Sequence, residues 1–339
     1  MARPFPHPVR WLSTDRQMPL RFVRGVGHHQ AMGEQLPIVF TPAIARSVGL
    51  SRSQVRRRLA SGSWLAIGRG AYAERHLVER PLGEPKAKYL LDVIAMLQRF
   101  GPDAHAALWS AAAAHDLPLP SSDGWPVSLV RPNGSARRRP GLTVDVAALP
   151  PEHLAKPGLL RTTSVGRTIV DLGRRAGLID AVTAADAALH NGLVSEAEIR
   201  EVLDFQAGWP GSARAEEVID LADGRAESPL ESRSRIRLRQ AGLPPPELQV
   251  EITDENGMFI ARPDFVWADL GVVGEADGRI KYSDGRGQTL WDEKRREDAL
   301  RQAGYEVVRW SFEDIEYQLD DVVRRFWAAV GLAARRRGR

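Results

Sequence analysis

The order of apolar runs and turn residues after Ser228 narrows the folds open to this chain more than any other feature. Asn256-Gly257 lies between two alternating apolar runs, which is a strong signal for a β-hairpin. The pattern predicts a helix from Ser228, strands at Leu248–Thr253, Phe259–Trp267 and Val272–Glu275, a helix at Trp291–Ala303, a strand at Tyr305–Trp310 and a helix at Phe312–Ala329. This order of elements makes a compact α/β sandwich.

The chain has 339 residues, too many for one ordinary domain of about 100 to 200 residues. We therefore expect a multidomain α+β protein. Turn residues and composition predict a disordered arm or overextended start at 1–36, a small domain at 37–80, a mixed α/β middle domain at 84–205, a linker and bridging helix at 206–226, the α/β sandwich at 227–330 and a basic tail at 331–339 that is frayed at Arg335–Arg339.

Cysteine is absent from the chain, which excludes disulfides and thiolate metal sites and fits a reducing compartment. No run reaches the roughly 18 apolar residues of a membrane span. We expect a cytoplasmic protein with no membrane partner.

The segment from Thr41 to Ala73 has six arginines and no acidic residue, whereas the whole chain has a net charge of only +4. Thr41 can cap a helix that starts at Pro42 and ends at Gly49, and Ser51 can cap a second helix that runs to Ala60. Two short helices joined by a glycine turn are typical of a helix-turn-helix. Two short apolar runs follow, separated by Gly68-Arg69-Gly70, and predict a hairpin where a winged helix-turn-helix has its wing.

The second helix turns Val55 and Leu59 toward the core and leaves its polar residues on other sides. The residues expected in the major groove of DNA are Arg52, Ser53, Gln54, Arg56 and Arg57. Arg58 and Arg69 are expected to contact DNA phosphates, and such contacts give affinity without reading the base sequence. The alternative is a solvated, arginine-rich helix.

The middle region alternates helical and strand patterns. The expected helices are Lys88–Phe100, Ala104–His115, Ser164–Arg174, Leu178–His190 and one from Ser195, and the expected strands are Val127–Val130 and Leu142–Val146. Arg137–Arg139 are expected in the loop between these strands. His115, Thr163, Arg167 and Asp171 are expected to pack and cap rather than to catalyse.

Three carboxylates are expected at strand ends of the last domain, where Asp264 can meet Glu275 and Asp277. Such a group would repel unless a cation lay among its members, and oxygen ligands select Mg²⁺ or Mn²⁺. All eight histidines occur at or before His190, so a zinc site is not expected in this domain. A magnesium site held by acidic residues suits phosphodiester hydrolysis.

The spacing of Pro263-Asp264 and Glu275-Ala276-Asp277-Gly278 resembles the PD-(D/E)XK nuclease fold, in particular its very-short-patch-repair-endonuclease-like branch. The resemblance implies a catalytic set of Glu231, Asp264, Glu275, Asp277 and Lys281, with metal on Asp264, Glu275 and Asp277. Asp277 stands where the superfamily has its catalytic lysine, and Lys281 where the branch usually has histidine. Lys281 or Lys294 could supply the missing cation.

Each carboxylate also has a structural interpretation. Glu231 can be a capping-box residue after Ser228, Asp277-Gly278 can be a turn, and Asp264 can solvate a strand end.

The segments from Phe40 to Tyr72, Ala113–Pro118 and Arg161–Leu172 resemble AbiEi-family antitoxins of type IV toxin–antitoxin systems. Together, the two resemblances cover residues 38 to about 330. They imply a DNA-binding protein that is a Mg²⁺-dependent DNA endonuclease or nickase. The alternatives are an antitoxin or transcriptional repressor with a degenerate nuclease domain, and a partner of a nucleotidyltransferase-type toxin.

Overall fold

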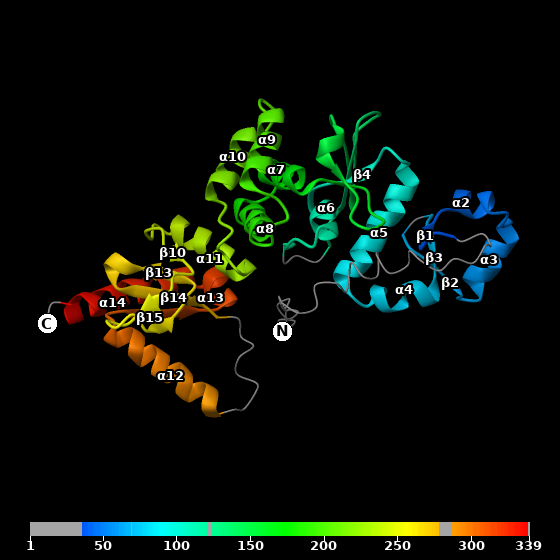
Figure 1. Ribbon diagram of the computed structural model, residues 1–339. Coiled ribbons are helices and arrows are strands. Elements are labelled where there is room, and N and C mark those ends of the chain that lie inside the picture. Colours follow the sequence, from blue (N-terminus) through cyan, green and yellow to red (C-terminus); the bar gives the residue numbers. More distant parts are fainter. Residues whose placement is uncertain (1–35, 69, 121–123, 278–286, 338–339) are drawn as a thin grey trace. The chain divides into compact units, whose positions relative to one another are not determined.

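The computed structural model describes residues 36–68, 70–120, 124–277 and 287–337 (Figure 1). One compact unit comprises residues 36–184 and 192–220 of this part, and a second comprises 185–191 and 221–337. Both units contain helices and sheets, which confirms a mixed α/β protein with more than one domain. Apart from Leu36, the predicted N-terminal arm lies outside the described residues.

Hydroxyl side chains cap the N-termini of the first two helices, at the residues that the sequence predicts. Thr41 Oγ1 accepts a hydrogen bond from Ile44 N at 3.3 Å, and Ser51 Oγ accepts one from Gln54 N at 3.2 Å. The elements are β1 (Val39–Phe40), α2 (Pro42–Ser47), α3 (Arg52–Ala60), β2 (Trp64–Ala66) and β3 (Tyr72–Glu74). The hairpin predicted from its glycines is present as β2 and β3, and β1 adds a third antiparallel strand in the order β1-β3-β2.

This small sheet shares a hydrophobic core with the helices and strands that follow it. Ile38, Val39 and Ala73 belong to the same cluster as residues of α5 and of the next sheet. The connecting helices are α4 (Arg75–Leu82) and α5 (Pro85–Phe100). One face of the small sheet is therefore continuous with the core of the next sheet, whereas Phe40, Val55 and Trp64 form a separate cluster with α2 and α3.

A six-stranded mixed sheet in the order β6-β7-β5-β4-β9-β8 lies after α5. Its elements are β4 (His105–Ala106), α6 (Leu108–Ala114), β5 (Val127–Arg131), β6 (Arg137–Arg139), β7 (Leu142–Val146), η1 (Pro151–His153), β8 (Leu154–Ala155) and β9 (Thr162–Thr163). β5 and β7 confirm the two predicted strands.

Two local predictions in this sheet are wrong. Residues 104–107 do not begin a helix, because Ala106 is buried and pairs with both Leu129 and Thr162, which overrides the helix propensity of alanine. Arg137–Arg139 are an edge strand antiparallel to β7 rather than a loop.

Helices α7 (Val165–Arg175), α8 (Leu178–His190), α9 (Glu196–Phe205) and α10 (Ser212–Leu221) occur where the sequence predicts helices. Residues 206–211 join α9 to α10 and pack against α7. Gln206 is fully buried, and a Cβ on Gly211 would lie 2.6 Å from the Arg174 carbonyl oxygen. This contact requires glycine, and Gly211 also has a positive φ of 87°.

The second unit has a four-stranded sheet in the order β10-β13-β14-β15, in which β14 and β15 are parallel and the other pairs are antiparallel. Its elements are α11 (Pro229–Gln240), β10 (Glu247–Leu248), β11 (Ile252–Thr253), β12 (Phe259–Ala261), β13 (Phe265–Trp267), η2 (Ala268–Leu270), β14 (Val272–Ala276), α12 (Gly287–Gln302), β15 (Glu306–Trp310), α13 (Phe312–Tyr317) and α14 (Leu319–Arg337).

Each face of this sheet has its own core because neighbouring strand residues point in opposite directions. Val272 packs in the cluster with Phe326 of α14, and Val273 packs in the cluster with Leu300 of α12. Figure 1 shows α14 and α12 on the two sides of the sheet. The predicted α/β sandwich is therefore a sheet between two helical layers.

Four predicted segments of this unit differ in the structure. The strand expected at Leu248–Thr253 breaks after Leu248 because Gln249 has a φ of 57°, and the next one breaks at Arg262–Asp264, where Pro263 has no N–H to donate. The final helix divides at Gln318. The region expected to be a frayed tail is helical through Arg337, whose guanidinium donates to two carbonyl oxygens of η2.

In the part of the chain that the structure describes, no helix combines the length and apolar character needed to cross a membrane.

Candidate functional sites

One side of α3 carries the arginines that the sequence predicts will enter the major groove of DNA. Arg52, Ser53, Arg56 and Arg57 are exposed, while Val55 of the same helix is buried against Phe40 and Trp64. Arg52 and Arg56 are four residues apart and therefore lie on one side of the helix. The result is a basic surface on a helix with no acidic residue in its first turn.

Gln54 and Arg58 are held by contacts within the protein. Gln54 Oε1 accepts a hydrogen bond from Ser51 N at 2.8 Å, which completes the capping box of α3. The Arg58 guanidinium lies 4.8 Å from the centre of the Trp64 ring, a cation–π distance. Arg69 lies outside the described residues.

The carboxylates predicted in the second unit lie at one end of its sheet. Asp264 immediately precedes β13, and the register that pairs Phe265 with Gly274 places it opposite Glu275. Asp264 Oδ2 accepts a hydrogen bond from Ala276 N at 2.8 Å.

Glu231, in the first turn of α11, reaches the same place through Gln249. Gln249 Nε2 donates to Glu231 Oε2 at 3.0 Å and to Asp264 Oδ1 at 3.2 Å. Burial, followed by repulsion from Glu231, raises the pKa of Asp264 to about 7. Ser228 also caps α11 by accepting from Glu231 N at 3.2 Å, so Glu231 combines the capping position with a place beside Asp264.

Glu275 is paired with two arginines that the sequence did not single out. Its Oε2 accepts from Arg309 Nε at 2.8 Å, and its Oε1 accepts from Arg296 Nη2 at 3.1 Å. Arg309 also donates to Glu297 Oε2 at 3.1 Å. Both oxygens of Glu275 therefore face guanidinium groups.

The donor set suits Mg²⁺ or Mn²⁺ in its chemistry, because it consists of carboxylate oxygens. Each oxygen of Asp264 and of Glu275 accepts one N–H, so an ion bound here would share these oxygens with their present donors or displace the arginines from Glu275. Among the described residues, no three or more acidic or histidine side chains are grouped closely enough to hold a metal ion. Asp277 N donates to Trp310 O at 2.8 Å, Lys294 is exposed, and Lys281 lies outside the described residues.

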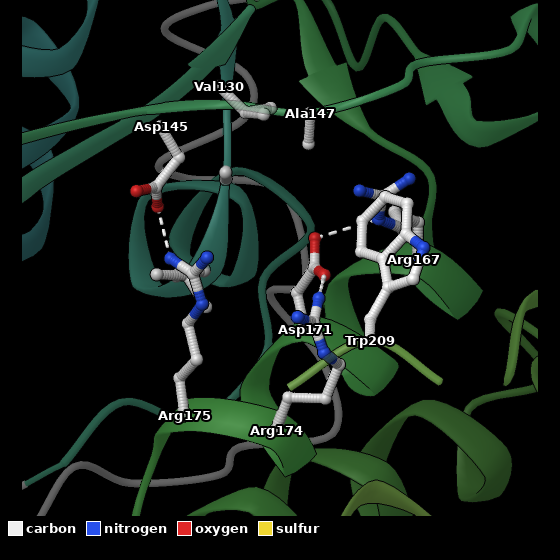
Figure 2. Close-up of a pocket in the computed structure, with 10 residues that line it drawn as sticks. Val130, Asp145, Ala147, Arg167, Asp171, Arg174, Arg175 and Trp209 are labelled. Carbon is white, nitrogen blue, oxygen red and sulfur yellow. Dashed lines mark hydrogen bonds and ion pairs between the residues drawn. The ribbon is translucent and has the colours of Figure 1, made fainter. Parts of the chain in front are cut away.

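A pocket in the first unit lies between the β5–β7 sheet and α7. Arg167, Arg174 and Arg175 line it together with Asp145, Asp171 and Trp209 (Figure 2). Leu108, also in its wall, has a φ of 49°, a left-handed conformation that a leucine rarely adopts.

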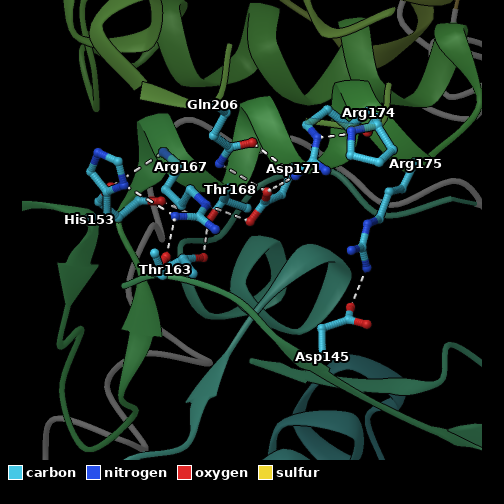
Figure 3. Close-up of polar contacts among 12 residues, drawn as sticks. Asp145, His153, Thr163, Arg167, Thr168, Asp171, Arg174, Arg175 and Gln206 are labelled. Atoms are coloured by element: carbon cyan, nitrogen blue, oxygen red, sulfur yellow. Dashed lines mark hydrogen bonds and ion pairs between the residues drawn. The ribbon is translucent and has the colours of Figure 1, made fainter. Parts of the chain in front are cut away.

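Two of these arginines share one carboxylate. Arg167 Nε donates to Asp171 Oδ2 at 2.8 Å, and Arg174 Nη1 donates to Asp171 Oδ1 at 3.2 Å (Figure 3). Arg174 Nη1 also donates to Gln206 Oε1 at 2.9 Å. The Trp209 ring centre lies 5.2 Å from the Arg167 guanidinium and 5.0 Å from that of Arg174.

A second carboxylate of the pocket is shared in the same way. Asp145 pairs with Arg175 through Oδ2 and with Arg138 of the edge strand β6 through Oδ1, the latter at 2.7 Å. The pocket thus lies beside two carboxylates and four guanidinium groups.

Sequence reasoning missed the pocket as a site because its residues come from distant segments. It named Arg167 and Asp171 as packing residues, which their mutual ion pair supports. Trp209 was included in a predicted linker. A tryptophan between glycines and a proline signals packing, because so large an apolar ring is rarely left in solvent.

No protein-family model matches the chain. Two curated proteins of Mycobacterium tuberculosis, from strains CDC 1551 / Oshkosh and ATCC 25618 / H37Rv, are each 29% identical to it over 267 residues. The matched region is 78% of this chain and 92% of each relative. Both relatives are named only as uncharacterized proteins, so the likeness brings no function to this chain.

Proposed function

We propose that this chain is a DNA-binding protein that places α3 in the major groove through a winged helix-turn-helix at residues 37–80. The observation that carries the proposal is the exposed side of α3, where Arg52, Arg56 and Arg57 project away from the buried Val55. No acidic residue occurs between Thr41 and Ala73 to offset this charge.

The contacts of α3 suggest which of its residues would read bases and which would bind phosphate. Arg52 and Arg56 have the length and the fork of donors to reach guanine edges. Gln54 has its amide oxygen in the capping box, which leaves that oxygen unsuited to a bidentate contact with adenine. Arg58 stacks on Trp64 at the edge of the hairpin and is proposed to bind phosphate.

The test is binding of the full-length protein to DNA from its own promoter region, measured by fluorescence anisotropy at several salt concentrations. Replacing Arg52 and Arg56 with alanine is expected to weaken binding at least about tenfold, because two bidentate contacts to guanine edges are lost. Arg99→Ala, which removes one arginine outside α3, is the control. If the double variant binds with unchanged affinity and salt slope, α3 does not contact DNA.

A second candidate function is Mg²⁺- or Mn²⁺-dependent DNA cleavage. The observation that favours it is the juxtaposition of Asp264 and Glu231 at the same end of the sheet as Glu275, because these three residues belong to the catalytic set that the PD-(D/E)XK resemblance implies. The arginines on Glu275 instead favour a nuclease-like domain that has lost its activity, as expected for a repressor or antitoxin.

Incubation of supercoiled plasmid with Mg²⁺ or Mn²⁺ distinguishes these two interpretations. Cleavage by the wild-type protein that disappears in Asp264→Asn and Glu275→Gln would support the enzyme. Intact plasmid with both metals would support a DNA-binding protein without nuclease activity.

A further inference from the structure

The pocket between the β5–β7 sheet and α7 has more guanidinium groups than carboxylates beside it. Arg167 and Arg174 are 1% and 6% exposed, and the carboxylate that both contact is Asp171. One carboxylate neutralises one of the two charges. Buried charges are stable only when they are paired, so this arrangement calls for a further anion.

Arg175, in the wall of the pocket, adds to the excess of positive charge. It is 39% exposed and pairs with Asp145, which Arg138 contacts as well. A guanidinium has five N–H donors, and the ion pair with Asp145 uses only one of the nitrogens of Arg175. Arg175 can therefore keep this partner and still donate to a ligand in the pocket.

The remaining contacts hold the arginines in place without adding negative charge. Trp209 attracts the guanidinium groups of Arg167 and Arg174 through its ring, which is neutral. Gln206 and the Pro210 carbonyl accept from Arg174 and are also neutral. Burial lowers the pKa of Arg174, as expected where positive charge is incompletely compensated.

We propose that this pocket binds one oxyanion of the phosphate type, with Arg175 as a direct donor and with Arg167 and Arg174 as buried positive charges behind it. The enclosed space is small, about 20 Å³, enough for about one water-sized group. A space of this size admits one phosphate oxygen, and the rest of the phosphate group would lie at the mouth of the pocket beside the exposed Arg175. The ligand that we propose is inorganic phosphate or the phosphate group of a small ester. Arginine forks match the geometry of phosphate oxygens.

The test is isothermal titration of the full-length protein with inorganic phosphate and, separately, with a nucleoside monophosphate. Saturable binding with Arg175→Ala at least about tenfold weaker is expected, because a hydrogen bond to a charged group is lost. Arg138→Ala is the matched control: it removes the other arginine on Asp145 but does not line the pocket, so affinity should be unchanged. In either variant Asp145 keeps one guanidinium partner.

The comparison of the two probes identifies the source of the phosphate group. Tighter binding of the nucleoside monophosphate indicates an ester ligand, and equal binding indicates that free phosphate suffices; both support the site. No saturable binding of either probe, or equal weakening in Arg175→Ala and Arg138→Ala, would overturn the proposal.

Tryptophan fluorescence gives an independent measurement, because Trp209 touches both buried arginines. Phosphate should change the fluorescence with the same Kd as in calorimetry, and Trp209→Phe should remove that change. A change that persists in Trp209→Phe would place the anion elsewhere and contradict the proposal.

Discussion

Replacing Asp264 with asparagine is expected to stabilise the protein at high pH and not at low pH. Burial and the neighbouring Glu231 raise the pKa of Asp264 from 3.8 to about 7. An acid with a raised pKa in the folded state favours folding only while it is protonated. Its contribution is therefore fully present below pH 3.8 and is lost as the pH rises to about 7.

The size of the effect follows from the pKa shift. A difference of about 3 pKa units corresponds to about 4 kcal/mol at 1.36 kcal/mol per unit. Asparagine cannot accept from both Ala276 N and Gln249 Nε2, because one of its two terminal atoms is a donor, and this loss costs about 1 kcal/mol. The net expectation is a gain of about 3 kcal/mol at pH 8 and a difference below about 1 kcal/mol near pH 4.

The measurement is urea denaturation of both proteins in EDTA at pH 4, 6 and 8, followed by tryptophan fluorescence; Trp267 and Trp310 report on this unit. Asp269→Asn, which changes an exposed carboxylate of the same unit, is the control and should alter stability by less than about 0.5 kcal/mol throughout. A constant difference between Asp264→Asn and wild type across this pH range would refute the assignment of Asp264 as a partly buried carboxyl group that titrates in this range.

Three further substitutions each test contacts inside one of the two units, and thermal denaturation measures the effect of each. Gly274→Ala should lower stability by about 1–3 kcal/mol, because the added Cβ would lie 2.4 Å from Trp310 Cη2; an unchanged Tm would contradict this contact. Ser51→Ala should cost about 1 kcal/mol through loss of the α3 cap, and Ser51→Asp, which can still cap, should restore most of it. Asp186→Ala should cost about 3–5 kcal/mol, because it leaves Arg235, whose side chain is 14% exposed, without this carboxylate, and an effect below 1 kcal/mol would contradict a stabilising role for the pair.

Local sequence signals were sufficient to predict helix caps and turns, because these depend on contacts between residues close together in the sequence. Thr41, Ser51 and Ser311 cap the helices that the sequence predicted, since a cap needs only a hydroxyl and the next backbone N–H groups. The Asn256-Gly257 turn joins β11 and β12 for the same reason, because Gly257 can adopt a positive φ of 78°.

Prediction was weaker where distant contacts decide the conformation. The alanines at 104, 106 and 107 have high helix propensity, but pairing with β5 and β9 makes His105 and Ala106 a strand. Gln249, whose φ is 57°, interrupts an alternating pattern that by itself predicts one strand, and its side chain bridges Glu231 and Asp264. These contacts join residues 15 and 18 positions apart, and no local pattern contains them.

The sequence by itself determined the positions of most helices and strands and the concentration of arginine on α3, because periodicity, capping and charge are local properties. It also placed Asp264 and Glu275 at neighbouring strand ends. Only the tertiary structure decided the partners of those carboxylates: Glu275 meets Arg296 and Arg309, and Asp264 meets Glu231 through Gln249. The physical reason is that a carboxylate binds whichever donor the fold brings to it, and in this protein those donors come from other elements.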